Sequence, residues 1–313
     1  EKINSLEERK QYVASKINPR RVNYVKKSYL ANYSMDEKDY YHNVRFLEGN
    51  EYKDKVDLFI GGSPCQSFTL LGYQKGLEEA RGTLFYEFAR LVSEIQPKAF
   101  IYENVQGLLK HDKGRTWEVV QRVFDSLGYK LHTQVLDAAN YGVPQKRERV
   151  IIVGIRNDLN DVMEYEFPKE TNKNNWVPLS VAVPKLAIEQ EKYYFSERAV
   201  QGMKNAKNNM KRGLYQDLNK PCLTVTSHLA KVSLNSRDPV PLVNPEKELY
   251  RRFTPLEAAR IQSFPDEFIF AGSETDAYRQ IGNAIPPVMF WHISDSVKNY
   301  LEMIEMAVCK KAI

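Results

Sequence analysis

The sequence predicts an α/β fold in which a doubly wound, mainly parallel sheet is joined to a smaller, irregular lobe. Between residues 56 and 155, short apolar segments alternate with segments of helical periodicity, a pattern typical of β-α-β units with right-handed crossovers. From about residue 161 to residue 246 this periodicity fades, and Asn, Lys and Pro become frequent. A chain of 313 residues is long enough to form two unequal lobes.

The individual elements follow from apolar runs and from helix start and stop signals. Asn18-Pro19 divides the polar N-terminal segment into two helical stretches, and Thr254 followed by Pro255 marks a capped helix start. Ligands of doubly wound sheets bind beyond the carboxyl ends of the strands. The expected strands are residues 56–60, 99–102, 130–136 and 149–155; the expected helices are residues 6–16, 23–32, 83–95, 116–127 and about 288–306, with one more beginning at Pro255.

These elements divide the chain into three segments. We expect residues 1–160 to form the large lobe, residues 161–272 to form the small lobe, and residues 273–313 to return to the large lobe. A solvated surface is the more common explanation of basic runs such as those in the small lobe.

Charge and cysteine content narrow the class of protein. The formal net charge of +5 is a modest excess, which is compatible with a cleft that contacts phosphates but does not require one. The cysteines, Cys65, Cys222 and Cys309, are odd in number and unrelated in spacing, so we expect neither a disulfide framework nor a metal site. We find no signal peptide and no apolar run long enough to span a membrane, and we expect a cytoplasmic protein.

A tight loop follows the first expected strand and carries a candidate nucleophile. The loop reads Gly61-Gly62-Ser63-Pro64-Cys65-Gln66-Ser67-Phe68. Two glycines allow a sharp turn, and Pro64 restricts both its own backbone and that of Ser63, so the thiol of Cys65 can be held in one direction. A structural cysteine in a strand-to-helix turn is the alternative interpretation of this loop.

Four further stretches contain residue types suited to chemistry. In Glu103-Asn104-Val105, a carboxylate at a strand end beside apolar neighbours could have a raised pKa and donate a proton. Gln145-Lys146-Arg147-Glu148-Arg149 precedes a strand and is expected to place Arg147 and Arg149 on one face. Residues 251–265 hold the capped helix, and residues 280–287 are expected to form a turn into the last helix. Taken singly, a solvated carboxylate, a surface ion pair and a plain turn explain these stretches equally well.

Taken together, the five stretches resemble the motifs of the DNA cytosine-5 methyltransferases of bacterial restriction-modification systems, in the same order, from about residue 24 to the end. The resemblance implies a large catalytic lobe with a Rossmann-like sheet that binds S-adenosyl-L-methionine, a small target-recognition lobe, and a cytosine flipped out of double-stranded DNA. It also implies that the protein acts on DNA in the bacterial cytoplasm.

The resemblance further implies roles for individual residues. The Cys65 thiolate would add to C6 of cytosine, and a protonated Glu103 would donate its proton to N3. Arg149 would lie against O2. Asn104 and Arg147 would hold the carboxylate and the loop in place. Contacts to DNA are expected from Gln66, Ser67, Gln145 and Thr226.

The cofactor site departs from the family pattern. No glycine precedes Gly49, so the usual Phe-x-Gly-x-Gly loop is missing from the sequence, and Arg20 lies about where an acidic residue is expected. Three explanations are open: an upstream segment, a partner polypeptide that supplies the loop, or an impaired enzyme retained for binding. A chain that begins at Glu1 favours the first two. The cofactor contacts implied by the resemblance are Asn43, Val44, Pro64, Asn283 and Ala284.

Two other functions compete with DNA methylation. A non-catalytic DNA-binding or regulatory subunit of the same fold is disfavoured because Cys65 and Glu103 are both present. An RNA cytosine-5 methyltransferase typically carries Cys-Phe-Thr in the small lobe, whereas this chain has Cys222-Leu223-Thr224, which is closer to the Pro-x-x-Thr-Val segment of the DNA enzymes.

Overall fold

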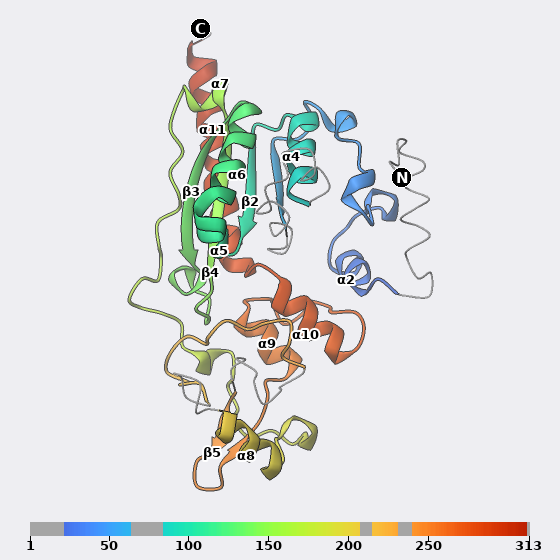
Figure 1. Ribbon diagram of the computed structural model, residues 1–313, viewed down its shortest axis with the longest axis vertical. Coiled ribbons are helices and arrows are strands. Elements are labelled where there is room, and N and C mark those ends of the chain that lie inside the picture. Colours follow the sequence, from blue (N-terminus) through green and yellow to red (C-terminus); the bar gives the residue numbers. More distant parts are fainter. Residues whose placement is uncertain (1–21, 64–83, 207–214, 231–239, 312–313) are drawn as a thin grey trace.

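A computed structural model describes residues 22–63, 84–206, 215–230 and 240–311, which form two lobes arranged along the long axis (Figure 1). The sheet lobe contains, among the described residues, four strands in the order β1-β2-β4-β3. The strands are β1 (Leu58–Gly62), β2 (Ala99–Asn104), β3 (Tyr129–Asp137) and β4 (Glu148–Arg156).

Helices cover both faces of this sheet because β2 and β4 are apolar on both sides. Phe100 and Tyr102 of β2 pack with α4 (Leu84–Ile95) and α6 (Arg115–Ser126), whereas the alternate residue Ile101 packs with α11 (Pro287–Lys311). Successive side chains of a strand point to opposite faces, so one strand contributes to two cores. The aromatic cluster beneath α4 and α6 includes Phe85, Phe88, Phe100, Tyr102 and Phe124.

The strand directions differ from the sequence prediction. Three of the four described strands of this sheet, β1, β2 and β3, run in the same direction, whereas β4 lies between β2 and β3 and is antiparallel to both. The expectation of a mainly parallel sheet is therefore wrong for β4. The reason lies in residues 138–147, which contain only a 3₁₀ turn (Ala138–Tyr141): a parallel return needs a long crossover, and this connection is too short for one.

The small lobe has little regular structure. It contains α8 (Glu197–Ala206), β5 (Leu242–Asn244), β6 (Leu249–Tyr250), α9 (Pro255–Ile261) and α10 (Glu274–Asn283), as expected for an irregular lobe. Tyr278 and Ile281 of α10 pack in the same cluster as Phe253 and Ile261, whereas α11 returns to the sheet. The division into residues 1–160, 161–272 and 273–313 stays a prediction, and the packing favours counting α10 with the small lobe.

The expected element positions agree closely with the described ones. Each expected strand lies within two residues of a described one at its start and end, and α9 has the expected Thr254 cap, with the reciprocal Glu257 bond. The turn expected at residues 280–287 is wrong in its first half, because residues 280–283 are the last turn of α10. Residues 6–16 lie outside the described part. The remaining short helices are α2 (Tyr24–Asn32), α5 (Gly107–Lys110) and α7 (Asn157–Asn160).

Helix α2 docks on the loop between α9 and α10. The Asn32 side chain donates to the carbonyl of Ile269 and accepts from its backbone N–H, both at 2.9 Å. The Ser28 hydroxyl accepts a further bond from the backbone N–H of Ala271, at 2.8 Å.

No helix in the described residues is both long and apolar enough to cross a membrane.

Candidate active site

The site begins where β1 and β2 end side by side. Gly62 is paired with Glu103, and a Cβ on Gly62 would lie 2.7 Å from the carbonyl oxygen of Glu103. Glycine is therefore required for this close approach. The chain continues from Ser63 into the loop with the candidate nucleophile, but Pro64, Cys65, Gln66 and Ser67 lie outside the described residues.

Asn104 holds the start of that loop. Its amide nitrogen donates to the carbonyl of Ser63 at 2.8 Å, and its amide oxygen accepts from the N–H of Val105 at 2.9 Å. The Ser63 hydroxyl also shares a hydrogen bond of 2.6 Å with the hydroxyl of Tyr102. These contacts are buried, so the last described residue before the loop has a fixed position.

Glu103 and Arg149 form a largely buried ion pair across β2 and β4. Arg149 Nε lies 2.9 Å from Glu103 Oε1, and the two side chains are 14% and 18% exposed. Arg149 Nη1 also donates to the carbonyl of Glu148 at 2.7 Å. Glu103 Oε2 has no hydrogen-bond partner among the described residues, so one carboxyl oxygen is available to a ligand.

Burial controls the charge state of this pair. Loss of solvation raises the pKa of Glu103 above its ordinary value, and the positive charges of Arg149 and Arg147 oppose that rise only in part. Burial likewise lowers the pKa of Arg149, against the attraction of Glu103. A carboxyl group with a raised pKa can hold a proton and donate it to a bound base, as the sequence predicts for Glu103.

Arg147 points toward the junction of the lobes and contacts three carbonyl oxygens there. It donates to Val225 at 2.9 Å and to Gly282 and Ala284 at 3.0 Å each. Burial and repulsion from Arg149 lower the pKa of Arg147 to about 9, and the negative charge of Glu103 opposes this lowering in part. Arg147 directly precedes the first residue of β4, and its charge acts on both Arg149 and Glu103. The expected common face of Arg147 and Arg149 stays a prediction.

Two residues predicted to contact DNA also lie at this junction. Gln145 is fully buried; its amide oxygen accepts from the N–H of Val225 at 2.9 Å, and its amide nitrogen donates to Gln262. The Thr226 hydroxyl accepts from the N–H of His228 at 3.2 Å. A DNA contact by either residue stays a prediction, and for Gln145 it would require these internal bonds to open.

The predicted cofactor residues supply part of a site. Asn43 begins a 3₁₀ turn (Val44–Phe46) and accepts from the N–H of Arg45 at 3.1 Å, while the Val44 carbonyl accepts from Arg90. Asn283 is exposed at the end of α10, next to Ala284. These amide groups can accept and donate hydrogen bonds, but they include no carboxylate for ribose hydroxyls. The described residues therefore fit S-adenosyl-L-methionine only in part, and they contain no metal-ligand cluster.

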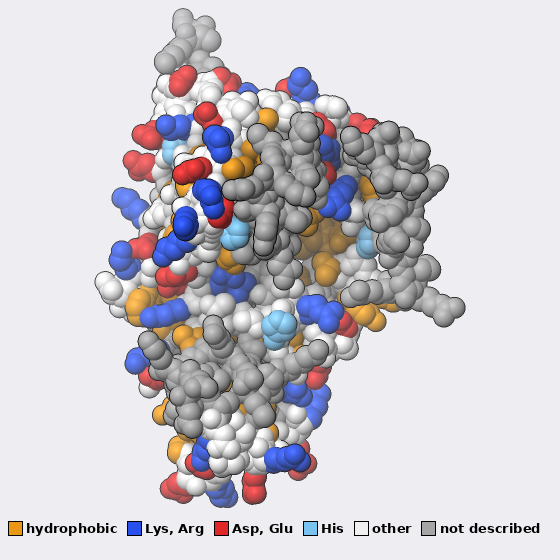
Figure 2. Space-filling view, viewed as in Figure 1, with side chains coloured by type: hydrophobic (Ala, Val, Ile, Leu, Met, Phe, Trp, Pro, Cys, Tyr) orange, Lys and Arg blue, Asp and Glu red, His pale blue; other side chains and the backbone are white. Residues whose placement is uncertain are grey.

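Positive side chains are spread over both lobes on the face shown in Figure 2, and some of them lie at the waist between the lobes. In the segment that leads into β4, the backbone N–H of Lys146 donates to the carbonyl of Cys222 at 2.8 Å. The Lys146 ammonium lies 4.3 Å from the ring centre of Trp176. Such a surface suits the phosphates of a nucleic acid.

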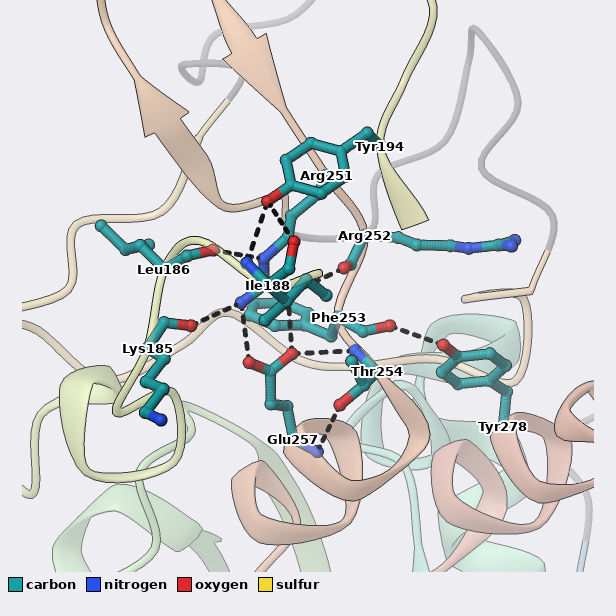
Figure 3. A network of polar contacts seen from close by, with 10 residues as sticks. All are labelled: Lys185, Leu186, Ile188, Tyr194, Arg251, Arg252, Phe253, Thr254, Glu257 and Tyr278. Carbon is teal, nitrogen blue, oxygen red and sulfur yellow. Dashed lines mark hydrogen bonds and ion pairs between the residues drawn. The ribbon is translucent and has the colours of Figure 1, made fainter. Parts of the chain in front are cut away.

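A buried polar network holds the small lobe together (Figure 3). The fully buried Arg251 donates to both carboxylate oxygens of Glu257, at 2.7 Å each, and also to the carbonyls of Leu186 and Lys185. Glu257 also accepts from the N–H of Thr254. Residues 251–265 were predicted to hold a capped helix, but no role was predicted for Arg251; the capping-box spacing Thr254-x-x-Glu257 was the available signal.

Solved structures identify the class of fold. The S. pombe Dnmt2 methyltransferase matches with a TM-score of 0.58 at 18% identity, over 82% of this chain and 83% of that one. The Entamoeba histolytica methyltransferase EhMeth matches with a TM-score of 0.65 at 15% identity, over 90% of this chain and 88% of that one. The fold is therefore that of these methyltransferases, although the sheet's described part is mixed.

Sequence relatives identify the family. The family described as C-5 cytosine-specific DNA methylase matches residues 6–299, and the chain belongs to that family. Type II methyltransferase M.Eco47II of Escherichia coli is 38% identical over 296 residues, which cover 84% of this chain and 68% of the relative. Type II methyltransferase M.Sau96I of Staphylococcus aureus is 35% identical over 291 residues, covering 83% and 65%. The chain thus spans about two thirds of the length of these relatives.

Proposed function

We propose that this chain carries the catalytic and target-recognition parts of a DNA cytosine-5 methyltransferase. The observation that carries the proposal is the buried pair Glu103–Arg149 beside the fixed entry of the Cys65 loop. Glu103 lies at the carboxyl end of β2, and Arg149 lies beside it at the start of the antiparallel strand β4. A proton donor and a cation placed together in this way match what a cytosine ring needs during nucleophilic addition.

In the proposed reaction, the Cys65 thiolate forms a bond to C6 of a flipped cytosine while N3 receives a proton from Glu103. The electron pair displaced from the C5–C6 bond makes C5 nucleophilic. When bound, S-adenosyl-L-methionine supplies the methyl group that C5 takes up. Loss of the C5 proton to a base, expulsion of the Cys65 thiolate and return of the N3 proton to the Glu103 carboxylate then restore the neutral aromatic ring. Arg149 stabilises negative charge at O2 through the same side chain that pairs with Glu103.

The proposed substrate is double-stranded DNA. C6 of a stacked base is inaccessible in a duplex, so the target base must first be extruded. The positive side chains at the waist support binding of the DNA backbone there. We assign sequence readout to the small lobe, between about residues 162 and 245. Replacing that segment with one from a related enzyme should move the methylated site, as read by bisulfite sequencing, and retention of the old site would contradict the assignment.

We further propose that the cofactor site is completed by a segment with a Phe-x-Gly-x-Gly loop, located upstream or on a second polypeptide. The described contacts at Asn43, Val44, Asn283 and Ala284 lack a close glycine turn and a ribose acceptor. Calorimetry of this chain alone should show weak or undetectable cofactor binding, which the added segment restores. Tight binding by the chain alone would contradict this part of the proposal.

The covalent step gives the sharpest test of the function. Cys65→Ser should abolish methyl transfer while DNA binding changes little, because the thiol is needed for bond formation to C6. Cys309→Ser is the matched control, since Cys309 is an exposed thiol on α11 and should be replaceable without loss of activity. Full methyl transfer by Cys65→Ser would reject the assignment.

A trapping experiment examines the same step independently. DNA with 5-fluorocytosine at the target should form a stable adduct with the active protein, since fluorine at C5 cannot leave as a cation. Cys65→Ser should form none. Failure of the wild type to form any adduct under conditions of active methyl transfer would rule out the thiol mechanism.

A further inference from the structure

We propose that Gln262 is a positioning residue that, with Gln145, sets the distance between the catalytic strand β4 and the target-recognition segment 222–226. This inference rests on the proposed function and assigns Gln262 a role that its family membership does not provide. Gln262 is fully buried and lies just after α9, where α9 and α10 meet the sheet lobe (Figure 1).

The amide of Gln262 joins two helix ends. Its nitrogen donates to the carbonyls of Ile281 and Ala284, each at 2.8 Å, and its oxygen accepts from the side-chain nitrogen of Gln145. Ile281 and Ala284 lie at the end of α10, on either side of the predicted cofactor residue Asn283. One side chain therefore ties the end of α9 to the segment that follows α10.

Gln145 continues the connection toward the recognition segment. Its amide oxygen accepts from the backbone N–H of Val225 at 2.9 Å, and its amide nitrogen lies 3.4 Å from the carbonyl oxygen of Ile261. The neighbouring backbone adds two bonds, from Lys146 N–H to the carbonyl of Cys222 at 2.8 Å and from Cys222 N–H to the carbonyl of Pro144 at 2.9 Å. The segment before β4 and the recognition segment thus lie side by side and are joined by backbone hydrogen bonds.

Arg147 completes the junction from the catalytic side. It donates to the carbonyls of Val225 and Ala284, so it shares Val225 with Gln145 and Ala284 with Gln262. Two residues further along, Arg149 contacts Glu103. The side chains of Gln145, Arg147 and Gln262 therefore connect the recognition segment with the end of α10 through hydrogen bonds, and the backbone of β4 leads from Arg147 to Arg149 of the catalytic ion pair.

If Gln262 had only a structural role, its replacement would lower folding stability and catalytic rate together. The Ile281 carbonyl also accepts from the N–H of Ala284, and the Ala284 carbonyl also accepts from Arg147, so both carbonyls keep a partner when Gln262 is replaced. The side-chain nitrogen of the buried Gln145 keeps only its 3.4 Å contact with the Ile261 carbonyl. Loss of Gln262 should therefore lower folding stability modestly, through this one weakened contact. Catalytic geometry is more demanding, because a misplacement of about 1 Å can cost on the order of a hundredfold in rate.

The test is Gln262→Met in the full chain, assayed with the cofactor-completing segment wherever methyl transfer requires it. Methionine preserves length and apolar volume but removes the three hydrogen bonds. We expect kcat to fall about tenfold or more, with the KM for DNA within about threefold of the wild type and the melting temperature only modestly lowered. Gln121→Met is the matched control, because Gln121 is exposed on α6 and its replacement should leave kcat unchanged.

Gln145→Met provides a second variant should Gln262→Met fail to fold, and it should give the same split between kcat and KM. The double variant should lose less than the product of the two single losses, because both changes remove one shared bond. A kcat within twofold of the wild type in folded variants, or equal losses in kcat, DNA affinity and melting temperature, would overturn the positioning role.

Hydrogen exchange decides the inference even if the wild type transfers no methyl group and the proposed function fails. Residues 222–226 and 281–286 should exchange faster in folded Gln262→Met than in the wild type, because they lose a shared anchor. Unchanged exchange in both segments would overturn the inference, whereas faster exchange with an inactive wild type would reject only the methyltransferase proposal.

Discussion

The two lobes are stabilised by different kinds of interior. Beneath α4 and α6 the sheet lobe is filled with aromatic rings, such as Phe88, Phe100 and Phe124, whose ring centres lie 4.5 to 6.1 Å apart. The small lobe instead contains Arg251 with no exposed side-chain surface, held by a carboxylate and by backbone carbonyls (Figure 3). The fully buried Gln262 has the same kind of partners at the junction.

This difference follows from secondary structure. In the sheet lobe, ladder bonds between strands satisfy the backbone, so apolar side chains can fill the interior. In the small lobe, much of the chain is irregular, and its buried carbonyls need other donors. Arginine and glutamine supply several donors from one side chain, which explains why charged and polar residues occupy central positions there. The sheet lobe thus depends mainly on apolar packing, whereas the small lobe combines an apolar cluster with side-chain hydrogen bonds to backbone carbonyls.

Among the substitutions that test this contrast, Arg251→Met should lower the free energy of unfolding the most. The change leaves Glu257 buried without its cation, and breaking a buried pair in this way typically costs about 3–5 kcal/mol. Chemical denaturation of the full chain would measure the loss in free energy of unfolding.

Arg260→Met is the control for Arg251→Met, because Arg260 forms an ion pair with Asp266 in which the two side chains are 30% and 55% exposed. Exposed pairs contribute about 0–1 kcal/mol. Equal losses in the two variants would show that burial of the arginine does not decide stability and would remove the contrast between the lobes.

A smaller effect is expected from Gly282→Ala, which acts where the lobes meet. A Cβ on Gly282 would lie 2.2 Å from the carbonyl carbon of Thr226 and 2.3 Å from the backbone nitrogen of Ser227. Backbone cannot yield as a flexible side chain can, so overpacking of about 1–3 kcal/mol is expected, together with reduced methyl transfer.

Gly107→Ala is the matched glycine control for Gly282→Ala. A Cβ there would meet only Val105 at 3.8 Å, so stability measured by thermal unfolding should be unchanged or slightly increased. A harmless Gly282→Ala change would mean that residues 226–227 can move away from α10 without cost.

The smallest expected effect is on the pH dependence of the free energy of unfolding, at the Glu103–Arg149 pair as compared with the Glu257–Arg251 pair. Glu257 accepts from Arg251 at both oxygens, whereas Glu103 Oε1 alone has a described partner, Arg149. Because burial raises the pKa of Glu103, its contribution to stability is fully present below the ordinary glutamate pKa of 4.5 and is lost as pH rises through the raised value.

Glu103→Gln should remove this dependence on pH. The free energy of unfolding of the wild type, measured relative to the variant between about pH 4 and pH 7, should therefore fall as pH rises. A relative stability that rises with pH would mean that the ion pair outweighs burial, and that Glu103 is not available as a proton donor.

Local sequence signals predicted most of the elements because those signals act within a few residues. Apolar runs located the four described strands of the sheet lobe but not β5 and β6 of the small lobe, and Thr254 with Pro255 located the start of α9. The carboxyl group of Glu103 was also recognised from its position at a strand end. Strand direction was not recognised, although the absence of a helical pattern between residues 138 and 147 was a usable signal for an antiparallel return.

The polar junction could not be predicted in the same way. Gln262 and Arg251 are important because of which distant carbonyls they reach, and those carbonyls belong to segments 19 to 66 positions away in sequence. Residue type and spacing do not report such contacts. The same limit applies to Gln145, whose buried position differs from what a predicted DNA contact requires.

The close packing at Gly282 has a thermodynamic consequence. The backbone of Thr226 fills the space beside Gly282, and the next residue, Asn283, belongs to the proposed cofactor site. A cofactor that shifts the end of α10 would therefore change the position of the recognition segment. Linkage requires the effect to be mutual: the factor by which cofactor changes DNA affinity equals the factor by which DNA changes cofactor affinity. The two ligands would then titrate as a coupled pair, with the same final occupancy whichever is added first.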